Sequence, residues 1–111
     1  MEDSSDIPRL RLKIFGGPST GEVFYFKSSG QELIIGRTPN CDVRIEDKLL
    51  SKAQSNIKYD TEQEAWILQD GYNGKTSTNG TWLYLNEDYP MYQGMVFKAN
   101  QTIFRTTIVD Q

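Results

Sequence analysis

Apolar and polar residues alternate strictly near the start of the chain. Residues 9–14 read Arg-Leu-Arg-Leu-Lys-Ile, with every second residue apolar. Successive side chains of a β-strand point to opposite faces, so a period of two is typical of a strand with one buried face. This segment therefore predicts a half-buried β-strand.

Short strand-like runs recur along the rest of the chain. Dense turn signals separate them, such as the Gly-Gly-Pro-Ser-Thr-Gly of residues 16–21. No window shows the i, i+3, i+4, i+7 apolar spacing of an amphipathic helix, so no helix of useful length is expected. The further expected strands cover residues 23–26, 33–35, 41–45, 55–59, 66–68, 82–85, 95–98 and 102–109.

About nine to eleven short strands at this spacing predict an all-β fold, either an antiparallel β-sandwich or a barrel. We expect a polar leader over residues 1–8 and one domain over residues 9–111, a common domain size. Cys41 is interpreted as a small buried hydrophobe. The aromatic residues expected to fill the core are Phe15, Phe24, Phe26, Trp66, Trp82, Phe97 and Phe104.

Composition narrows the class of protein. The chain is 37% apolar and 24% charged, as in ordinary soluble globular proteins. Its apolar runs are far shorter than a membrane span, and its acidic start lacks a signal-peptide pattern. Cys41 is the one cysteine, so no internal disulfide can form. These features predict an intracellular protein, cytoplasmic or nuclear, that does not bind membranes.

Charge and the absence of histidine exclude further functions. The net charge of −3 argues against direct binding of nucleic acid. Without histidine, the usual general base near neutral pH, histidine metal ligands and Ser–His nucleophiles are all missing. The sequence therefore predicts no enzyme, no metal, no cofactor and no small-molecule substrate.

Three polar clusters lie where turns are expected, at residues 36–37, 51–54 and 78–81. Together they supply a guanidinium, an ammonium, hydroxyls and a side-chain amide, which are the donors that an oxyanion needs. Loops gather at the ends of a sandwich, so these clusters can converge on one pocket. Basic residues in or beside them favour capture of a small anion: Arg37, Arg44, Lys48, Lys52 and Lys75.

The spacing and flanking residues of these clusters resemble the forkhead-associated (FHA) domain, a phosphothreonine-binding module. Members of that family have Gly-Arg, then Ser-x-x-His, then Ser/Thr-x-Asn-Gly-Thr followed by a bulky apolar residue. The matching segments here are Ile35–Asp42, Leu50–Gln54 and Ser77–Trp82. The resemblance covers essentially the whole chain. It implies a β-sandwich of about eleven strands, with binding loops at one end, that recognises phosphothreonine on partner proteins in signalling.

Carried over residue by residue, the resemblance implies a binding site. Arg37 and Ser51 would bind the phosphate with help from Lys52. Thr78 would help form the pocket for the threonine methyl, and Asn79 would hold the peptide backbone.

Other motif positions have supporting roles. The resemblance implies a structural role for Gly36, and Gly80 and Thr81 complete the third motif. Gln54 departs from the family, because a histidine that holds the loops usually stands there. Glutamine can also donate and accept hydrogen bonds, so the scaffold can survive. The alternative is a degenerate FHA-like domain that binds an unphosphorylated partner through another surface.

Peptide selectivity is the least specified property. Two segments differ from the family pattern: residues 71–75, which resemble an insertion, and residues 85–90. Leu50 is expected to point into the core, which leaves Leu49 exposed as a scattered surface residue or as an apolar contact at the pocket rim. Lys48 beside it can attract an acidic side chain. We predict an aliphatic preference at the third residue after phosphothreonine, with tolerance of acid.

Overall fold

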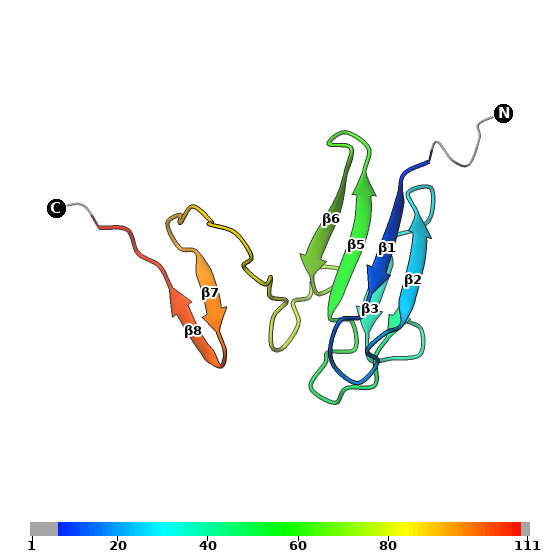
Figure 1. Ribbon diagram of the computed structural model, residues 1–111, viewed down its shortest axis with the longest axis horizontal. Coiled ribbons are helices and arrows are strands. Elements are labelled where there is room, and N and C mark those ends of the chain that lie inside the picture. The colour runs from blue at the N-terminus through cyan, green and yellow to red at the C-terminus, as the bar shows by residue number, and fades with distance from the viewer. Residues whose placement is uncertain (1–6, 110–111) are drawn as a thin grey trace. The chain divides into compact units, whose positions relative to one another are not determined.

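A computed structural model describes residues 7–109 of the chain and contains eight strands and no helix among them. The all-β prediction is confirmed (Figure 1). Residues 1–6 of the predicted leader lie outside the described residues. The strands are β1 (Arg9–Lys13), β2 (Val23–Lys27), β3 (Leu33–Gly36), β4 (Val43–Arg44), β5 (Ser55–Asp60), β6 (Ala65–Asp70), β7 (Val96–Ala99) and β8 (Thr102–Arg105).

The chain divides into two compact units, Met1–Thr81 and Trp82–Gln111. In the first unit, β1 and β2 form an antiparallel hairpin, and a four-stranded sheet has the order β4-β3-β5-β6. In the second unit, β7 and β8 form a separate antiparallel hairpin.

The core of the first unit lies between its two sheets. Leu33, Val43 and Ile57 of the four-stranded sheet are buried. Apolar residues of the β1–β2 hairpin pack against these three side chains, as the alternation in residues 9–14 predicts. Two residues of the larger sheet and one residue directly after β4 also pack against them. These surrounding residues are Leu10, Leu12, Phe24, Phe26, Ile35, Ile45 and Trp66.

One pairing differs from the antiparallel prediction. β3 and β4 run parallel, with Ile35 opposite Val43. The carboxylate of Asp42 accepts a hydrogen bond from the backbone N–H of Ile34 at 2.8 Å, so the chain returns beside the start of β3. Val43 then continues in the direction of β3 rather than against it. The larger sheet is therefore mixed.

The strand count also differs from about eleven. Residues 82–85, expected as a strand, form no strand in the part of the chain that the structure describes. Apolar side chains alone do not make a strand, which also requires a backbone ladder with a neighbouring strand. The predicted strands at 41–45 and 102–109 are likewise shortened to β4 and β8.

Four aromatic residues were wrongly assigned to the core: Trp82, Phe97 and Phe104 of the second unit are 37–44% exposed, and Phe15 is 95% exposed. Ile14, one residue earlier, closes the β1–β2 hairpin through backbone bonds with Glu22 and Gly21. Phe15 therefore points to the same face of the hairpin as Lys13, and this face is exposed to solvent.

The second unit is organised by its hairpin. Phe97 and Phe104 are opposite each other in β7 and β8, and their rings stack with centroids 4.9 Å apart. Asn100 has a φ of 54° in the connecting turn, a conformation that asparagine tolerates better than most residues. The ammonium of Lys98 lies 5.8 Å from the ring centroid of Trp82, which gives a cation–π contact.

Candidate functional site

A pocket of about 810 Å³ opens where the three polar clusters meet in the first unit. Every residue that the sequence assigned to peptide or phosphate contact lines it. The remaining lining comes from the neighbouring loop positions and from a turn that follows β6. The complete lining is Arg37, Lys48, Leu49, Leu50, Ser51, Lys52, Ala53, Tyr72, Asn73, Lys75, Thr76, Thr78 and Asn79.

The pocket is cationic although the chain is acidic. Four lining residues carry positive charge, and none of the lining residues carries a carboxylate. The chain as a whole has a net charge of −3. A concave site lined by one sign of charge concentrates ligands of the opposite sign. The arrangement therefore favours a small anionic ligand.

Gly36 allows the first loop to approach the second. A Cβ built at this buried position would collide with the backbone carbonyl of Lys52 and would lie 2.8 Å from the sulfur of Cys41. The thiol of Cys41 donates to the same carbonyl at 3.1 Å. Only glycine fits this contact without displacing the backbone, which gives Gly36 the structural role that the resemblance implies.

Arg37 follows Gly36, and hydrogen bonds from its backbone N–H and from one side-chain nitrogen hold it in place. Its N–H lies 3.2 Å from the carbonyls of both Ser51 and Lys52, and its Nε donates to the carbonyl of Leu50 at 3.1 Å. Its two terminal nitrogens donate to no group within residues 7–109. The half-buried guanidinium is thus positioned with its terminal donors available to a ligand in the pocket.

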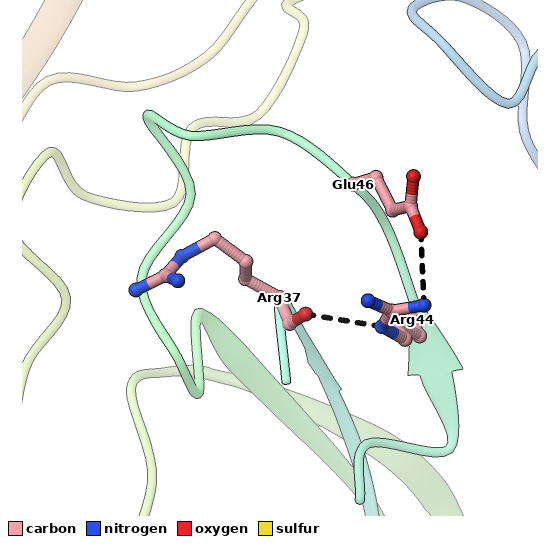
Figure 2. A network of polar contacts seen from close by, with 3 residues as sticks. All are labelled: Arg37, Arg44 and Glu46. Carbon is pink, nitrogen blue, oxygen red and sulfur yellow. Dashed lines mark hydrogen bonds and ion pairs between the residues drawn. The ribbon is translucent and has the colours of Figure 1, made fainter. Parts of the chain in front are cut away.

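Arg44 fixes the backbone of Arg37 and is absent from the pocket lining. Its Nε donates to the carbonyl of Arg37 at 3.3 Å, and its Nη1 forms an ion pair with Glu46 at 3.0 Å (Figure 2). In this view the side chain of Arg37 extends away from Arg44 and Glu46. The two arginines therefore have different roles, although the sequence placed both near the clusters.

Ser51 and Thr78 connect loops that are 27 residues apart. The hydroxyl oxygen of Ser51 accepts from the backbone N–H of Thr78 at 2.9 Å. The same hydroxyl also lies 3.5 Å from the hydroxyl oxygen of Thr78, beyond the usual O–H···O distance of about 2.5–3.0 Å, so this bond is weak. The short bond orients Ser51, and the long bond leaves its proton easy to redirect to a stronger acceptor such as an oxyanion.

Asn79 is a second residue that joins these two loops. Its Nδ2 donates to the carbonyl of Leu49 at 3.0 Å. Leu49 is 76% exposed and Leu50 is partly buried, but Leu50 also lines the pocket and is not among the core residues, so its expected position in the core is not confirmed. Lys48, Leu49 and Leu50 all lie on the pocket side of this loop, and Asn79 is fixed against the backbone of Leu49.

Gln54 lies behind the pocket and links both loops. It is 7% exposed; its Oε1 accepts from the backbone N–H of Ser51 at 3.0 Å, and its Nε2 donates to the carbonyl of Gly80 at 2.8 Å. One amide thus satisfies a donor on one loop and an acceptor on the other. The hydroxyl of Thr81 adds contacts of 2.7 Å to Ser55 and 3.3 Å to the carbonyl of Gln54.

Asp70, at the end of β6, is a supporting residue that the sequence analysis missed. Its carboxylate accepts from the hydroxyl and N–H of Ser77 at 2.5 and 3.1 Å and from the hydroxyl of Thr81 at 2.7 Å. Partial burial acts to raise the pKa of Asp70, but these bonds and one from the N–H of Gly71 outweigh it and hold the pKa below its ordinary value. The sequence signal for this supporting role was a carboxylate at the end of a strand, directly before a loop rich in serine and threonine.

A second missed element is the turn of residues 72–75. Tyr72 and Lys75 exchange backbone hydrogen bonds of 3.0 and 3.1 Å, and Asn73 and Gly74 have φ values of 55° and 81°. Positive φ at both central residues is typical of a tight type I′ hairpin turn. The Asn-Gly dipeptide carries this signal, although the segment resembled an insertion. The turn adds Tyr72, Asn73 and Lys75 to the pocket wall.

The part of the chain that the structure describes holds neither a metal site nor a membrane-spanning helix. No group of three or more Cys, Asp and Glu residues there is arranged to hold a metal ion. Nor does that part of the chain contain a helix long and apolar enough to span a membrane.

The described residues form a β-rich module with a pocket lined by cations. A family model described as the FHA domain matches residues 33–98, more than half of the chain. The chain therefore belongs to the FHA domain family, as its motifs indicated. FHA domains are phosphopeptide-binding modules of signalling proteins; they bind phosphorylated protein partners and are not enzymes. Comparison with curated proteins found no match.

Proposed function

We propose that this chain binds phosphothreonine in partner proteins and so mediates phosphorylation-dependent protein–protein interaction in signalling. The observation that carries the proposal is that four cationic side chains and the Ser51 hydroxyl line one pocket, and that no carboxylate is among its lining residues. The proposed scaffold is the family's β-sandwich of about eleven strands. The proposal includes no catalytic residue, cofactor or metal, and no direct binding of nucleic acid.

The phosphate binds between the first two loops. The terminal nitrogens of Arg37 donate to its oxygens, and the proton of Ser51 turns from Thr78 to the phosphate. Lys52, which is exposed and lines the same pocket, adds a mobile positive charge. Charge-assisted bonds of this kind contribute about 1.5–3 kcal/mol each.

The peptide around the phosphate contacts the third loop. Thr78 lies against Ser51 and is therefore beside the proposed phosphate position, where its side chain helps to enclose the threonine methyl. Asn79, anchored to the Leu49 carbonyl, holds the peptide backbone. Leu49 and Lys48 contact the third residue after phosphothreonine, with an aliphatic preference and tolerance of acid.

The alternative function is that of a degenerate FHA-like domain with another binding surface. It was considered because Gln54 replaces the histidine that is usual in the family. The two hydrogen bonds of Gln54 link the loops that carry Ser51 and Gly80, which is the supporting role expected of the usual histidine. This contact supports the phosphopeptide proposal over the alternative.

The test is calorimetric titration with three versions of one peptide, carrying phosphothreonine, phosphoserine or unmodified threonine. A degenerate phosphothreonine library first selects the flanking residues. We expect no measurable binding of the unmodified peptide. Phosphoserine should bind about fourfold more weakly than phosphothreonine, because burying one methyl contributes about 0.8 kcal/mol.

Equal affinity for the phosphorylated and unmodified peptides would overturn the proposal. Equal affinity for phosphothreonine and phosphoserine would leave phosphate recognition in place and remove the assigned methyl pocket. A selected library with aspartate and no aliphatic residue at the third position would contradict the role of Leu49.

A further inference from the structure

The pocket holds more positive charge than one phosphate needs. A phosphate ester carries a charge of about −1.5 to −2 at neutral pH. Arg37 and Lys52 are sufficient to match it, and Lys48 and Lys75 remain in the same lining. The proposed phosphate contacts also come from the loops around residues 37 and 51, while Lys75 lies on a different element. Lys75 therefore has no assigned partner in the proposed complex.

Lys75 is presented by a firmly held backbone. The 72–75 turn is closed by two backbone hydrogen bonds, and its preceding residue, Gly71, is anchored on both sides. The N–H of Gly71 donates to the carbonyl of Gln54 at 2.8 Å, and its carbonyl accepts from Nδ2 of the buried Asn56 at 2.8 Å. A β-carbon added at Gly71 would collide with the carbonyl of Lys75, so this approach also requires glycine. The turn is thus tied to Gln54, the residue that links the binding loops.

The side chain of Lys75 is exposed and forms no ion pair within residues 7–109. Tyr72 and Lys75 form a bridged pair, and paired residues project from the same face of a ladder. Both line the cationic pocket. They also border a neighbouring cavity of about 390 Å³, which contains Glu32 and Asp70. The carboxylate of Asp70 is already engaged by Ser77 and Thr81.

We propose that Lys75 forms a second anion subsite in the pocket, which binds an acidic side chain flanking the phosphothreonine. The ligand of this subsite is a carboxylate or a second phosphate, since both offer oxygen acceptors to an ammonium. This inference rests on the proposed function and identifies its substrate class as peptides that carry two anionic groups. The subsite differs from that of Leu49 and Lys48, because Lys75 is presented by the 72–75 turn and not by the loop before Ser51.

The test uses the full chain and a set of phosphothreonine peptides. One peptide has neutral flanking residues, and the others carry a single glutamate, or a single phosphoserine, at each flanking position in turn. At one position we expect an acidic residue to raise affinity by about fivefold, within the range of exposed charge pairs. Phosphoserine there should raise it further because of its higher charge. The glutamate and phosphoserine peptides thereby distinguish the two anion sources.

The variant Lys75→Gln should remove this gain while changing affinity for the neutral phosphothreonine peptide by less than about twofold. Lys27→Gln, on the exposed side of β2 and outside both cavities, is the matched control and should keep the full gain. Lys75→Glu should reverse the preference, so that an arginine at the sensitive position binds better than glutamate.

An acidic gain that survives in Lys75→Gln would overturn the assignment, and so would the absence of a gain at every position. In both cases binding of the neutral phosphothreonine peptide would leave the proposed function intact. If that peptide itself failed to bind, both proposals would be overturned.

Discussion

The two parts of the pocket are built by different physical means. The loops that carry Ser51 and Thr78 are joined by short hydrogen bonds and by a buried amide. We call these contacts the loop network, together with the bonds that join Arg37 to Leu50 and Asp70 to Ser77 and Thr81. The lysines at positions 48, 52 and 75 are exposed and reach the pocket on long side chains. We call them the lysine set.

The difference separates positioning from charge. A hydrogen bond within the loop network fixes a donor before the ligand arrives, so little conformational entropy is lost on binding. An exposed lysine has many rotamers and is screened by salt, so its contribution is smaller and depends on conditions. The loop network should therefore determine whether the phosphate binds at all, and the lysine set should adjust affinity and peptide preference.

Arg37→Ala should have the largest effect, because Arg37 combines fixed geometry with charge. Loss of its contacts to the phosphate removes about 1.5–3 kcal/mol, or one to two decades of affinity for a phosphothreonine peptide. Calorimetry measures the affinity, and circular dichroism should show an unchanged fold. Arg11→Ala, on the exposed face of β1 and outside the pocket, is the control. Unchanged affinity in Arg37→Ala would show that the site has been misassigned.

Gln54→Ala should break the loop network without touching the ligand. It leaves the N–H of Ser51 and the carbonyl of Gly80 without their partner at a buried position, which costs about 2 kcal/mol of unfolding free energy. Urea denaturation measures this loss, and phosphopeptide affinity should fall with it. Gln54→His should retain nearly full stability and affinity, because imidazole can also donate and accept. A large affinity loss in Gln54→His at unchanged stability would instead indicate direct ligand contact.

Acid should weaken the loop network through Asp70. Its pKa is lower in the folded protein than in the unfolded chain, so the unfolded state binds more protons as the pH falls. The stability that Asp70 contributes is present above about pH 4 and is lost as the pH falls through its folded pKa. Urea denaturation of Asp70→Asn should show a shallower loss of stability between about pH 5 and 2 than the natural sequence. The control Glu62→Gln, in the exposed β5–β6 turn, should keep the steeper slope.

Lys52→Gln should have the smallest effect. Its exposed ammonium should contribute about two- to fivefold in phosphopeptide affinity at low salt. That contribution should shrink as ionic strength rises, whereas the Arg37 effect should persist. Titrations at two salt concentrations distinguish these behaviours. Equal salt sensitivity of the two variants would remove the distinction between the loop network and the lysine set.

The local alternation in the sequence predicted most of the strands but not their partners. Both strands of the β1–β2 hairpin and the turn between them were predicted, but their pairing was not. The parallel β3–β4 pair depends on the bond between Asp42 and Ile34, and no side-chain period encodes such a contact. Residues 82–85 show the reverse case, since they have the apolar composition of a strand but no ladder.

For the candidate site, motifs identified the residues that face the pocket better than those behind it. Arg37, Ser51 and Asn79 stand in recognisable turn contexts, and the structure places all three in one lining. Asp70 was not identified, because its role comes from three hydrogen bonds formed only in the folded loop. Lys75 was noted for its charge, but the tight turn that directs it was interpreted as an insertion.

The amide of Gln54 also makes the link between the loops insensitive to protons. A histidine in its place would have to remain neutral, because a protonated ring has no nitrogen left to accept from the N–H of Ser51. Histidine changes charge near pH 6.5, within the range that cells experience, whereas an amide does not titrate there. The whole chain contains no histidine. Mild acidification should therefore act on the phosphate group of the ligand, whose second ionisation lies near pH 6, and leave the geometry of the receptor unchanged.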